Sequence, residues 1–413
     1  MTSLNAAFAQ LDESATVALA DRVRKMRASG TEVVGLQTGD PDFPTPAPIV
    51  EAAFRGMRDG QTHYCDSRGL PALREAIAES LRASRNIEFS PGAEILVTTG
   101  GVHAYFCALQ AILNADEEVL VPDPTWMTHA NLVRALRGRP VRVPAFAEDR
   151  FWPTLPAWRA ALTPRTRALV ICSPNNPSGM IATSGYLTEL LEFALANRLY
   201  IISDEVYDNI VFDGRAHCSI ASLPGAAENT LLINSFSKTF AMTGWRIGYL
   251  AAPARLISQA VKASQNSVTC VAPFIQLAAV EALTNREVAN EVARMSAAYA
   301  TRRNRVLELR REHGTSPIAL HKPEGAFYFF LDIRRIGLSS SEAAERALKE
   351  AAVALVPGSA FGRYGEGFLR MTIAAADESV ETGFRRLLQW GDSAGPVEPT
   401  ALAACGGASS NTL

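Results

Sequence analysis

Short apolar runs rich in β-branched residues alternate with segments of helical periodicity between residues 94 and 251. Such runs are typical of strands buried on both faces of a parallel sheet, and the segments between them repeat apolar residues with the period of a helix. This alternation predicts an α/β fold, with a three-layer α/β/α large domain and a mostly parallel sheet. We expect strands at 94–98, 118–121, 168–172, 199–203, 230–234 and 246–251, and helices at 103–113, 125–136 and 186–197.

The pattern changes after about residue 285 and predicts a smaller α+β domain. We expect a long polar helix at 286–313, strands at 327–331, 354–356 and 368–373, and helices at 340–352 and 378–388. An N-terminal helix at 16–28, capped by Ser14 or Thr16, joins this domain. The predicted division is a large domain of residues 46–285, a small domain of 11–45 and 286–390, and a disordered tail at 391–413, where Gly, Ser, Ala and Pro occur without period.

Composition and charge exclude several classes of protein. The 413 residues contain 40 Lys+Arg and 42 Asp+Glu, a net charge of −2, which disfavours a nucleic-acid partner. No apolar run reaches the roughly 20 residues of a membrane helix, and the first residues lack the pattern of a signal peptide. The six cysteines are scattered without a Cys-x-x-Cys pair, so we expect no metal site and no disulfide, and a cytoplasmic location.

The densest chemical signal surrounds Lys238, one of only five lysines. It follows an apolar strand and lies between Ser235, Ser237 and Arg246, in the sequence SFSKTFAMTGWRIG. Apolar surroundings and nearby cations lower the pKa of a lysine and make its amine nucleophilic, while hydroxyls and a guanidinium bind a phosphate dianion. The motif therefore offers an amine for a Schiff base and a phosphate anchor, as pyridoxal phosphate requires. A solvated loop lysine is the alternative, but it leaves the hydroxyls and Arg246 unexplained.

Three weaker signals also follow predicted strands. Asp204 closes one strand, where a carboxylate can pair with a protonated pyridine nitrogen, and Tyr207 follows three residues later. Asn176 lies in a turn after another strand. Gly101 lies between a strand and a helix, where glycines let a phosphate approach backbone amides. Each alone is more simply explained as a cap or turn.

Together these segments resemble the pyridoxal-phosphate-dependent class I/II aminotransferases of fold type I, and most closely the bacterial aspartate-aminotransferase-like subgroup. The resemblance covers about residues 11–390. It implies that Lys238 forms the internal aldimine and later moves the proton, and that Asp204 pairs with the ring nitrogen. It further implies cofactor contacts from Gly101, Val102, Trp126 (stacking), Asn176, Tyr207, Ser235, Ser237 and Arg246, and no metal.

The resemblance also implies a substrate site and a partner. Arg370 matches the arginine that binds the substrate α-carboxylate, with Gly39 and Asn176 as further substrate contacts. Tyr64 matches a tyrosine that reaches the phosphate of the neighbouring subunit, which implies a homodimer.

The predicted activity is transfer of an amino group from an amino acid to a 2-oxo acid through the Lys238 aldimine. The alternatives are a lyase, a γ-replacement enzyme or a cyclising enzyme of specialised biosynthesis on the same scaffold, because a fold does not fix a reaction. A regulator with an aminotransferase-like domain would need a DNA-binding region, for which little sequence precedes the resemblance.

Val102 argues against aspartate as the preferred donor. In aspartate-using members of the subgroup, a lysine that reads the distal carboxylate stands at this position. In another branch an arginine of the partner does so, from a loop that maps to residues 262–273, where this chain has no arginine. We expect a neutral or aromatic donor, unless Arg68 or Arg363 supplies the cation.

Overall fold

A large sheet of seven strands organises the structure, which is a computed structural model describing residues 5–9, 11 and 15–394. Its strand order is β2-β8-β7-β6-β5-β3-β4, and all pairs are parallel except those of β8 with β2 and β7. The predicted α/β fold with a mostly parallel sheet is confirmed. The strands are β2 (Ile95–Thr98), β3 (Glu118–Asp123), β4 (Arg139–Pro144), β5 (Thr166–Cys172), β6 (Tyr200–Asp204), β7 (Thr230–Ser235) and β8 (Gly248–Ala251).

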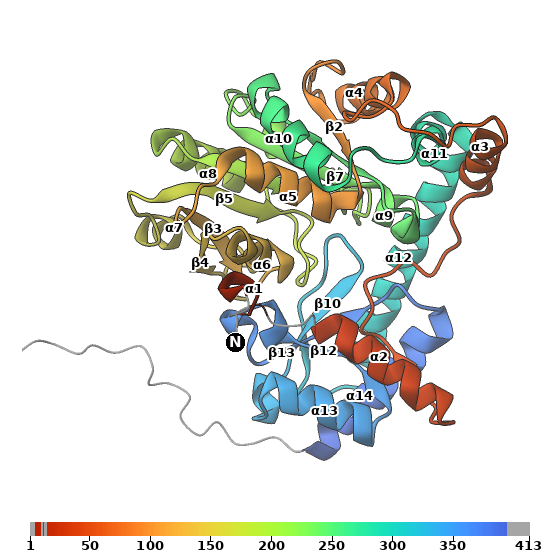
Figure 1. The fold of residues 1–413 in the computed structure, drawn as a ribbon. Coiled ribbons are helices and arrows are strands. Elements are labelled where there is room, and N and C mark those ends of the chain that lie inside the picture. Colours follow the sequence, from red (N-terminus) through yellow and green to blue (C-terminus); the bar gives the residue numbers. More distant parts are fainter. Residues whose placement is uncertain (1–4, 10, 12–14, 395–413) are drawn as a thin grey trace, which may run out of the picture.

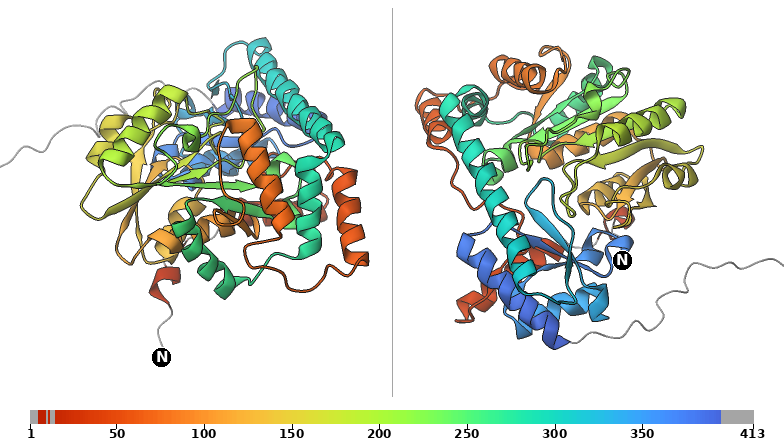
Figure 2. Two further views of the ribbon diagram at one scale, coloured as in Figure 1. Left: turned by 90° about the horizontal axis from the view of Figure 1, so that it is seen from above. Right: turned by 180° about the vertical axis from the view of Figure 1, so that it is seen from behind.

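Helices cover both faces of this sheet (Figures 1 and 2). In β2, Leu96 packs toward the helices of one face, whereas Ile95 and Val97 pack toward those of the other, as the two-residue period of a strand requires. One face is covered by α5 (Gly100–Ile112) and α10 (Ala254–Ser267). The other is covered by α3 (Ala47–Arg58), α4 (Pro71–Arg85), α7 (Leu155–Ala160), α8 (Ser184–Ala196) and α11 (Pro273–Thr284).

A second unit is built around a four-stranded antiparallel sheet of order β12-β13-β10-β9. The long helix α12 (Arg286–Glu312) connects it to the large sheet (Figure 2). Its strands are β9 (Ala319–Leu320), β10 (Tyr328–Asp332), β12 (Val356–Pro357) and β13 (Phe368–Thr372), with β1 (Val34–Gly35) parallel to β11 (Val353–Ala354). Its helices are α2 (Ala15–Ala28), α13 (Ser340–Glu350) and α14 (Asp377–Ala394).

Two further helices lie beside each other. They are α1 (Ala6–Ala9) and α6 (Thr128–Ala135), which are in contact. The domain boundaries after residues 45 and 285 stay predictions. No helix among the described residues is long and apolar enough to cross a membrane, and the cytoplasmic location also stays a prediction.

Three expectations for local structure are corrected. The single strand at 354–356 is wrong, because the chain turns at buried Leu355 and enters two different sheets through β11 and β12. The tail does not begin at Gly391, because α14 continues to Ala394 and Gly391 is packed against Ile318. Residues 395–413 and the predicted cap Ser14 lie outside the described residues, and Thr16 lies inside α2 rather than capping it.

Phe330 packs between the two units and lies on β10, the strand next to the one that carries Arg370. Its ring is fully buried and stacks on Phe368 with the centroids 4.8 Å apart, within a core that also holds large-sheet residues such as Leu169. Across the β10–β13 ladder Phe330 faces Arg370.

We therefore expect Phe330→Ala to lower the free energy of unfolding by about 3–5 kcal/mol, because it removes a buried ring and leaves a cavity. Urea unfolding followed by circular dichroism measures this change. Phe146→Ala is the control, since Phe146 is 48% exposed and its loss should cost less than about 1 kcal/mol. Equal losses in the two variants would contradict this packing role.

Candidate active site

A cavity of about 350 Å³ lies at the carboxyl ends of β5, β6 and β7, the edge where open parallel sheets bind ligands. It brings together every residue that the sequence predicted for the site except Tyr64. The predicted residues that line it are Gly39, Gly101, Val102, Trp126, Asn176, Asp204, Tyr207, Ser235, Ser237, Lys238, Arg246 and Arg370.

Lys238 lies on the short helix α9 (Phe236–Thr239), which begins directly after β7. Ser235 caps this helix, because its hydroxyl accepts a hydrogen bond from the Ser237 backbone N–H at 3.2 Å. The Lys238 Nζ donates to the Gly39 carbonyl oxygen at 2.6 Å. The pKa of Lys238 is lowered to about 8, mainly by desolvation and also by the positive charges of Arg370 and Arg246, against the opposing effect of Asp40. The amine is thus much closer to its neutral, nucleophilic form than a free lysine.

One end of the cavity is built to hold a dianion. The hydroxyl oxygens of Ser235 and Ser237 lie 2.9 Å apart, next to the amino end of α5 and the Arg246 guanidinium. Gly100 has φ +81°, and a Cβ there would lie 2.7 Å from Arg246 Nη2, so only glycine fits. Helix amides, two hydroxyls and a guanidinium match the oxygens of a phosphate group.

The other end presents a buried carboxylate. Asp204 is the last residue of β6, and its Oδ2 lies 3.0 Å from His129 Nε2. The His129 ring is fully buried and lies 5.4 Å, centroid to centroid, from the Trp126 ring, which it meets at 90°. The sequence motifs did not identify His129. The available signal was its spacing of three residues from Trp126, although Trp126 lies just before α6 rather than on a helix.

Arg370 is a buried guanidinium without a carboxylate partner among the described residues. Its Nη1 donates to Asn176 Oδ1 at 3.1 Å and its Nη2 to the Gln37 carbonyl oxygen at 2.7 Å, while Nε has no partner. The rings of Tyr328 and Phe361 lie 4.4 and 4.9 Å from the guanidinium carbon. Burial lowers the pKa of Arg370. These contacts fix the side chain and leave it able to receive an anion.

Two tyrosines meet above Gly39. The Tyr207 and Tyr328 hydroxyl oxygens lie 2.9 Å apart, and burial raises the pKa of both phenols. A Cβ on Gly39 would lie 2.2 Å from the Tyr328 hydroxyl, so a larger residue would not fit. No sequence motif pointed to Tyr328. Other lining residues that the sequence analysis did not single out are Val17, Thr128, Cys172, Val206 and Thr243.

Tyr64 lies outside the cavity and is 87% exposed.

Among the described lining residues the cations are Lys238, Arg246 and Arg370. Neither Arg68 nor Arg363 lines the cavity. The donor set fits pyridoxal 5′-phosphate, because a dianion site, a buried amine and a buried carboxylate surround one volume.

Comparisons with known proteins agree with this geometry. Residues 31–387 match the family model described as aminotransferase class I and II. An aspartate aminotransferase of Pyrococcus abyssi is 43% identical over 86% of this chain and 91% of its own length. Aromatic-amino-acid aminotransferase 2 of Thermococcus litoralis is 42% identical over 87% of this chain and 92% of its own length. A solved structure of aspartate aminotransferase from Thermus thermophilus with maleate has a TM-score of 0.89 at 37% identity, covering 94% of this chain and 100% of that chain.

The lowered pKa of Lys238 can be measured in cofactor-free protein. Competitive acetylation of Lys238 against pH should give a midpoint near the value of about 8 that burial imposes. Arg370→Met should raise this midpoint, because it removes a positive charge that disfavours the ammonium form. Arg334→Met is the control, since Arg334 pairs with Asp332 and does not line the cavity. A wild-type midpoint at the ordinary lysine value of about 10.4 would contradict the prediction.

Proposed function

Because the chain belongs to the class I and II aminotransferases, enzymes that transfer amino groups with pyridoxal 5′-phosphate, we propose that it transfers the amino group of a neutral or aromatic amino acid to a 2-oxo acid in the cavity around Lys238. The observation that carries this proposal is the position of a single buried amine between a dianion site and a carboxylate.

Residues at three places would hold the cofactor. Arg246, the hydroxyls of Ser235 and Ser237, and the backbone amides at the amino end of α5, Gly101 and Val102, would bind its phosphate. Asp204, whose Oδ2 lies 3.0 Å from His129 Nε2, would pair with the ring nitrogen and favour its protonated form. Trp126, Asn176 and Tyr207 line the same cavity, where they would contact the ring and its oxygen.

The bound cofactor supplies an electron sink that makes the substrate Cα–H bond acidic. Lys238 Nζ would hold the cofactor, and its neutral amine is the base that would accept the proton from the substrate Cα. Arg370 and Asn176 bind the substrate α-carboxylate and so orient the Cα–H bond toward Lys238. The Gly39 carbonyl accepts a hydrogen bond from Nζ at 2.6 Å and so restrains the position of the amine.

The charge inventory of the cavity supports a donor without a side-chain carboxylate. The three lining cations are all engaged, with Lys238 and Arg246 at the cofactor and Arg370 at the α-carboxylate. Val102, which is 37% exposed, and Val17 instead offer apolar surface. Burial of a second carboxylate without a cation costs several kcal/mol. The names of the relatives include both aspartate and aromatic aminotransferases, so the lining residues decide the proposal.

Specificity constants for a panel of amino donors, measured through the 2-oxo acid formed, test the reaction and the substrate together. We expect phenylalanine, tyrosine or a neutral aliphatic donor to exceed aspartate by tenfold or more, about 1.4 kcal/mol of transition-state preference. Val102→Lys should narrow this ratio by adding a cation to the cavity wall, whereas Leu195→Lys, on the outside of α8, should leave it unchanged. Lys238→Ala should abolish turnover. A preference for aspartate would contradict the proposed class of amino donor, and absence of any 2-oxo acid would contradict transamination.

The exposed Tyr64 supports a homodimer with shared sites, as an aromatic residue that is 87% exposed in one chain suits an interface. In this arrangement the Tyr64 hydroxyl binds the phosphate held by the partner, and each site uses its own Arg370.

Mixing Tyr64→Phe subunits with Arg370→Ala subunits tests the shared site. Random exchange makes half of the dimers hybrids, and each hybrid has one site without either substitution, so about a quarter of wild-type activity should return. Separately purified variants, assayed without exchange, are the control. Failure of mixing to restore activity, or a fully active monomer in sedimentation at micromolar concentration, would contradict the proposal.

A further inference from the structure

We propose that Arg85 is a positioning residue for the phosphate end of the cofactor site and that it acts on Ser235 through Asp208 and Asn234. The inference rests on the proposed function, in which the Ser235 hydroxyl binds the cofactor phosphate.

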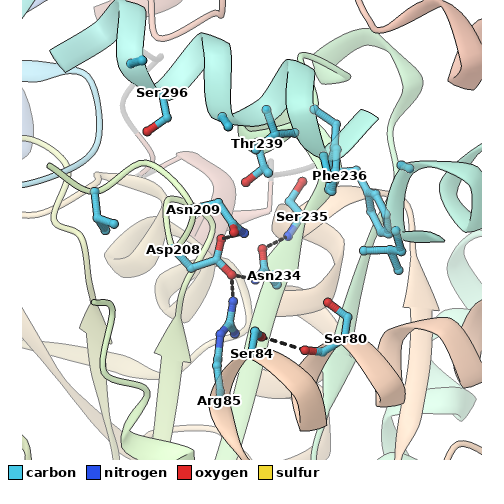
Figure 3. A pocket seen from close by; sticks show the side chains of 18 of the residues that line it. Ser80, Ser84, Arg85, Asp208, Asn209, Asn234, Ser235, Phe236, Thr239 and Ser296 are labelled. Carbon is cyan, nitrogen blue, oxygen red and sulfur yellow. Dashed lines mark hydrogen bonds and ion pairs between the residues drawn. The ribbon is translucent and has the colours of Figure 1, made fainter. Parts of the chain in front are cut away.

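The structure has a second cavity, of about 590 Å³, whose lining side chains are drawn in Figure 3. Its walls come from α4, α9, α11 and α12 and from the segment 208–213. Ser235 lines both cavities, so whatever fixes Ser235 from the second cavity also fixes it in the first.

Three successive contacts connect Arg85 to Ser235, and Figure 3 marks each of them with a dashed line. The Arg85 Nη2 forms an ion pair with Asp208 Oδ2. The same carboxylate oxygen accepts from Asn234 Nδ2 at 2.6 Å, and Asn234 Oδ1 accepts from the Ser235 backbone N–H at 2.6 Å. The Arg85 and Asp208 side chains are only 9% and 2% exposed.

The charge of Asp208 determines which way the Asn234 amide faces. An ionised carboxylate only accepts hydrogen bonds, so the amide must turn its NH₂ group to Asp208 and its oxygen to the Ser235 N–H. This contact fixes the backbone of the residue that caps α9 and carries the phosphate-binding hydroxyl. A buried carboxylate keeps its charge only beside a cation, and among the described residues Arg85 is the cation paired with Asp208.

Arg85 also lies 3.1 Å from Glu205 Oε2, next to the ring-binding Asp204, yet the ring end should depend on it less. Glu205 keeps three other partners, since it accepts from Ser203 at 2.8 Å and Ser219 at 2.6 Å and lies 2.9 Å from His217 Nε2. Without Arg85, the partners that Asp208 retains within the described part of the chain are the side-chain amides of Asn209 and Asn234. Loss of Arg85 should therefore weaken the phosphate end selectively.

Pyridoxal, which lacks the phosphate, separates this effect from a general loss of structure. Dissociation constants of pyridoxal 5′-phosphate and pyridoxal are measured by spectroscopic titration of the full-length protein. We expect Arg85→Met to weaken the phosphorylated cofactor by about tenfold or more and pyridoxal by less than about threefold. Arg82→Met is the matched control, because Arg82 lies in the last turn of the same helix and pairs with Glu79 on the surface. It should change neither constant.

A double variant tests the route. If Arg85 acts through Asn234, the variant with both Arg85→Met and Asn234→Ala should bind the phosphorylated cofactor no more weakly than Asn234→Ala alone. Additive losses, or equal weakening of both ligands by Arg85→Met, would overturn the inference. If Arg85→Met does not fold, Arg85→Lys, which keeps the charge but loses the two-pronged geometry, must still weaken the phosphorylated cofactor more than pyridoxal. Equal weakening would overturn the inference.

Ser235→Ala distinguishes failure of the inference from failure of the proposed function. If Ser235→Ala weakens the phosphorylated cofactor selectively and Arg85→Met does not, only the role of Arg85 is wrong. If Ser235→Ala weakens neither ligand, the proposed phosphate contact itself is wrong and the inference fails with it.

Discussion

The alignment of three parallel strand ends determines the site. Across the sheet Cys172 pairs with Asp204, and Asp204 pairs with Ile233, so β5, β6 and β7 finish within two residues of one another. This common edge places the Asp204 carboxylate and Ser235 at opposite ends of one cavity and directs the chain that follows β7 into the helix of Lys238. Because Asp204 is the only carboxylate among the described lining residues and three cations face it, the cavity carries an excess of positive charge that an anion must balance.

The two cavities that Ser235 lines, at the end of β7, differ in charge. The active-site cavity has three cations and one carboxylate among its described lining residues. Near the second cavity, by contrast, Arg85 is paired with the two carboxylates of Glu205 and Asp208. A network satisfied in this way holds polar side chains rigidly, because any unpaired member would be costly in the interior. The polar part of the wall of the second cavity, formed by Arg85, Asp208 and Asn234, is therefore held nearly immobile, and it supports Ser235.

Local motifs predicted most of the site because its members end a strand or follow one within a few residues. Ser235, Asp204 and Asn176 could be found from the position of a turn after an apolar run, and the parallel sheet then brings them together without further information. His129 and Arg85 could not be found in this way, since each matters through a partner that is distant in sequence, Asp204 in one case and Asp208 in the other.

The same limit applies to the fold. The buried central strands were predicted from their apolar composition, but the edge strand β4 was not, because its residues are only partly buried and include Pro140 and Pro144. The split of residues 353–357 between two sheets depends on pairing with β1 and β13, which no local pattern encodes.

Helix α2 brings Val17 to the wall of the active-site cavity, and this has a practical consequence for recombinant production. A bulky label attached to α2 near Val17 would lie at this wall and would compete with the substrate for space. Helix α14 ends on the side of the small unit that faces away from the large sheet (Figure 1). Attachment at the end of α14 is therefore the better choice for kinetic work or immobilisation on a support.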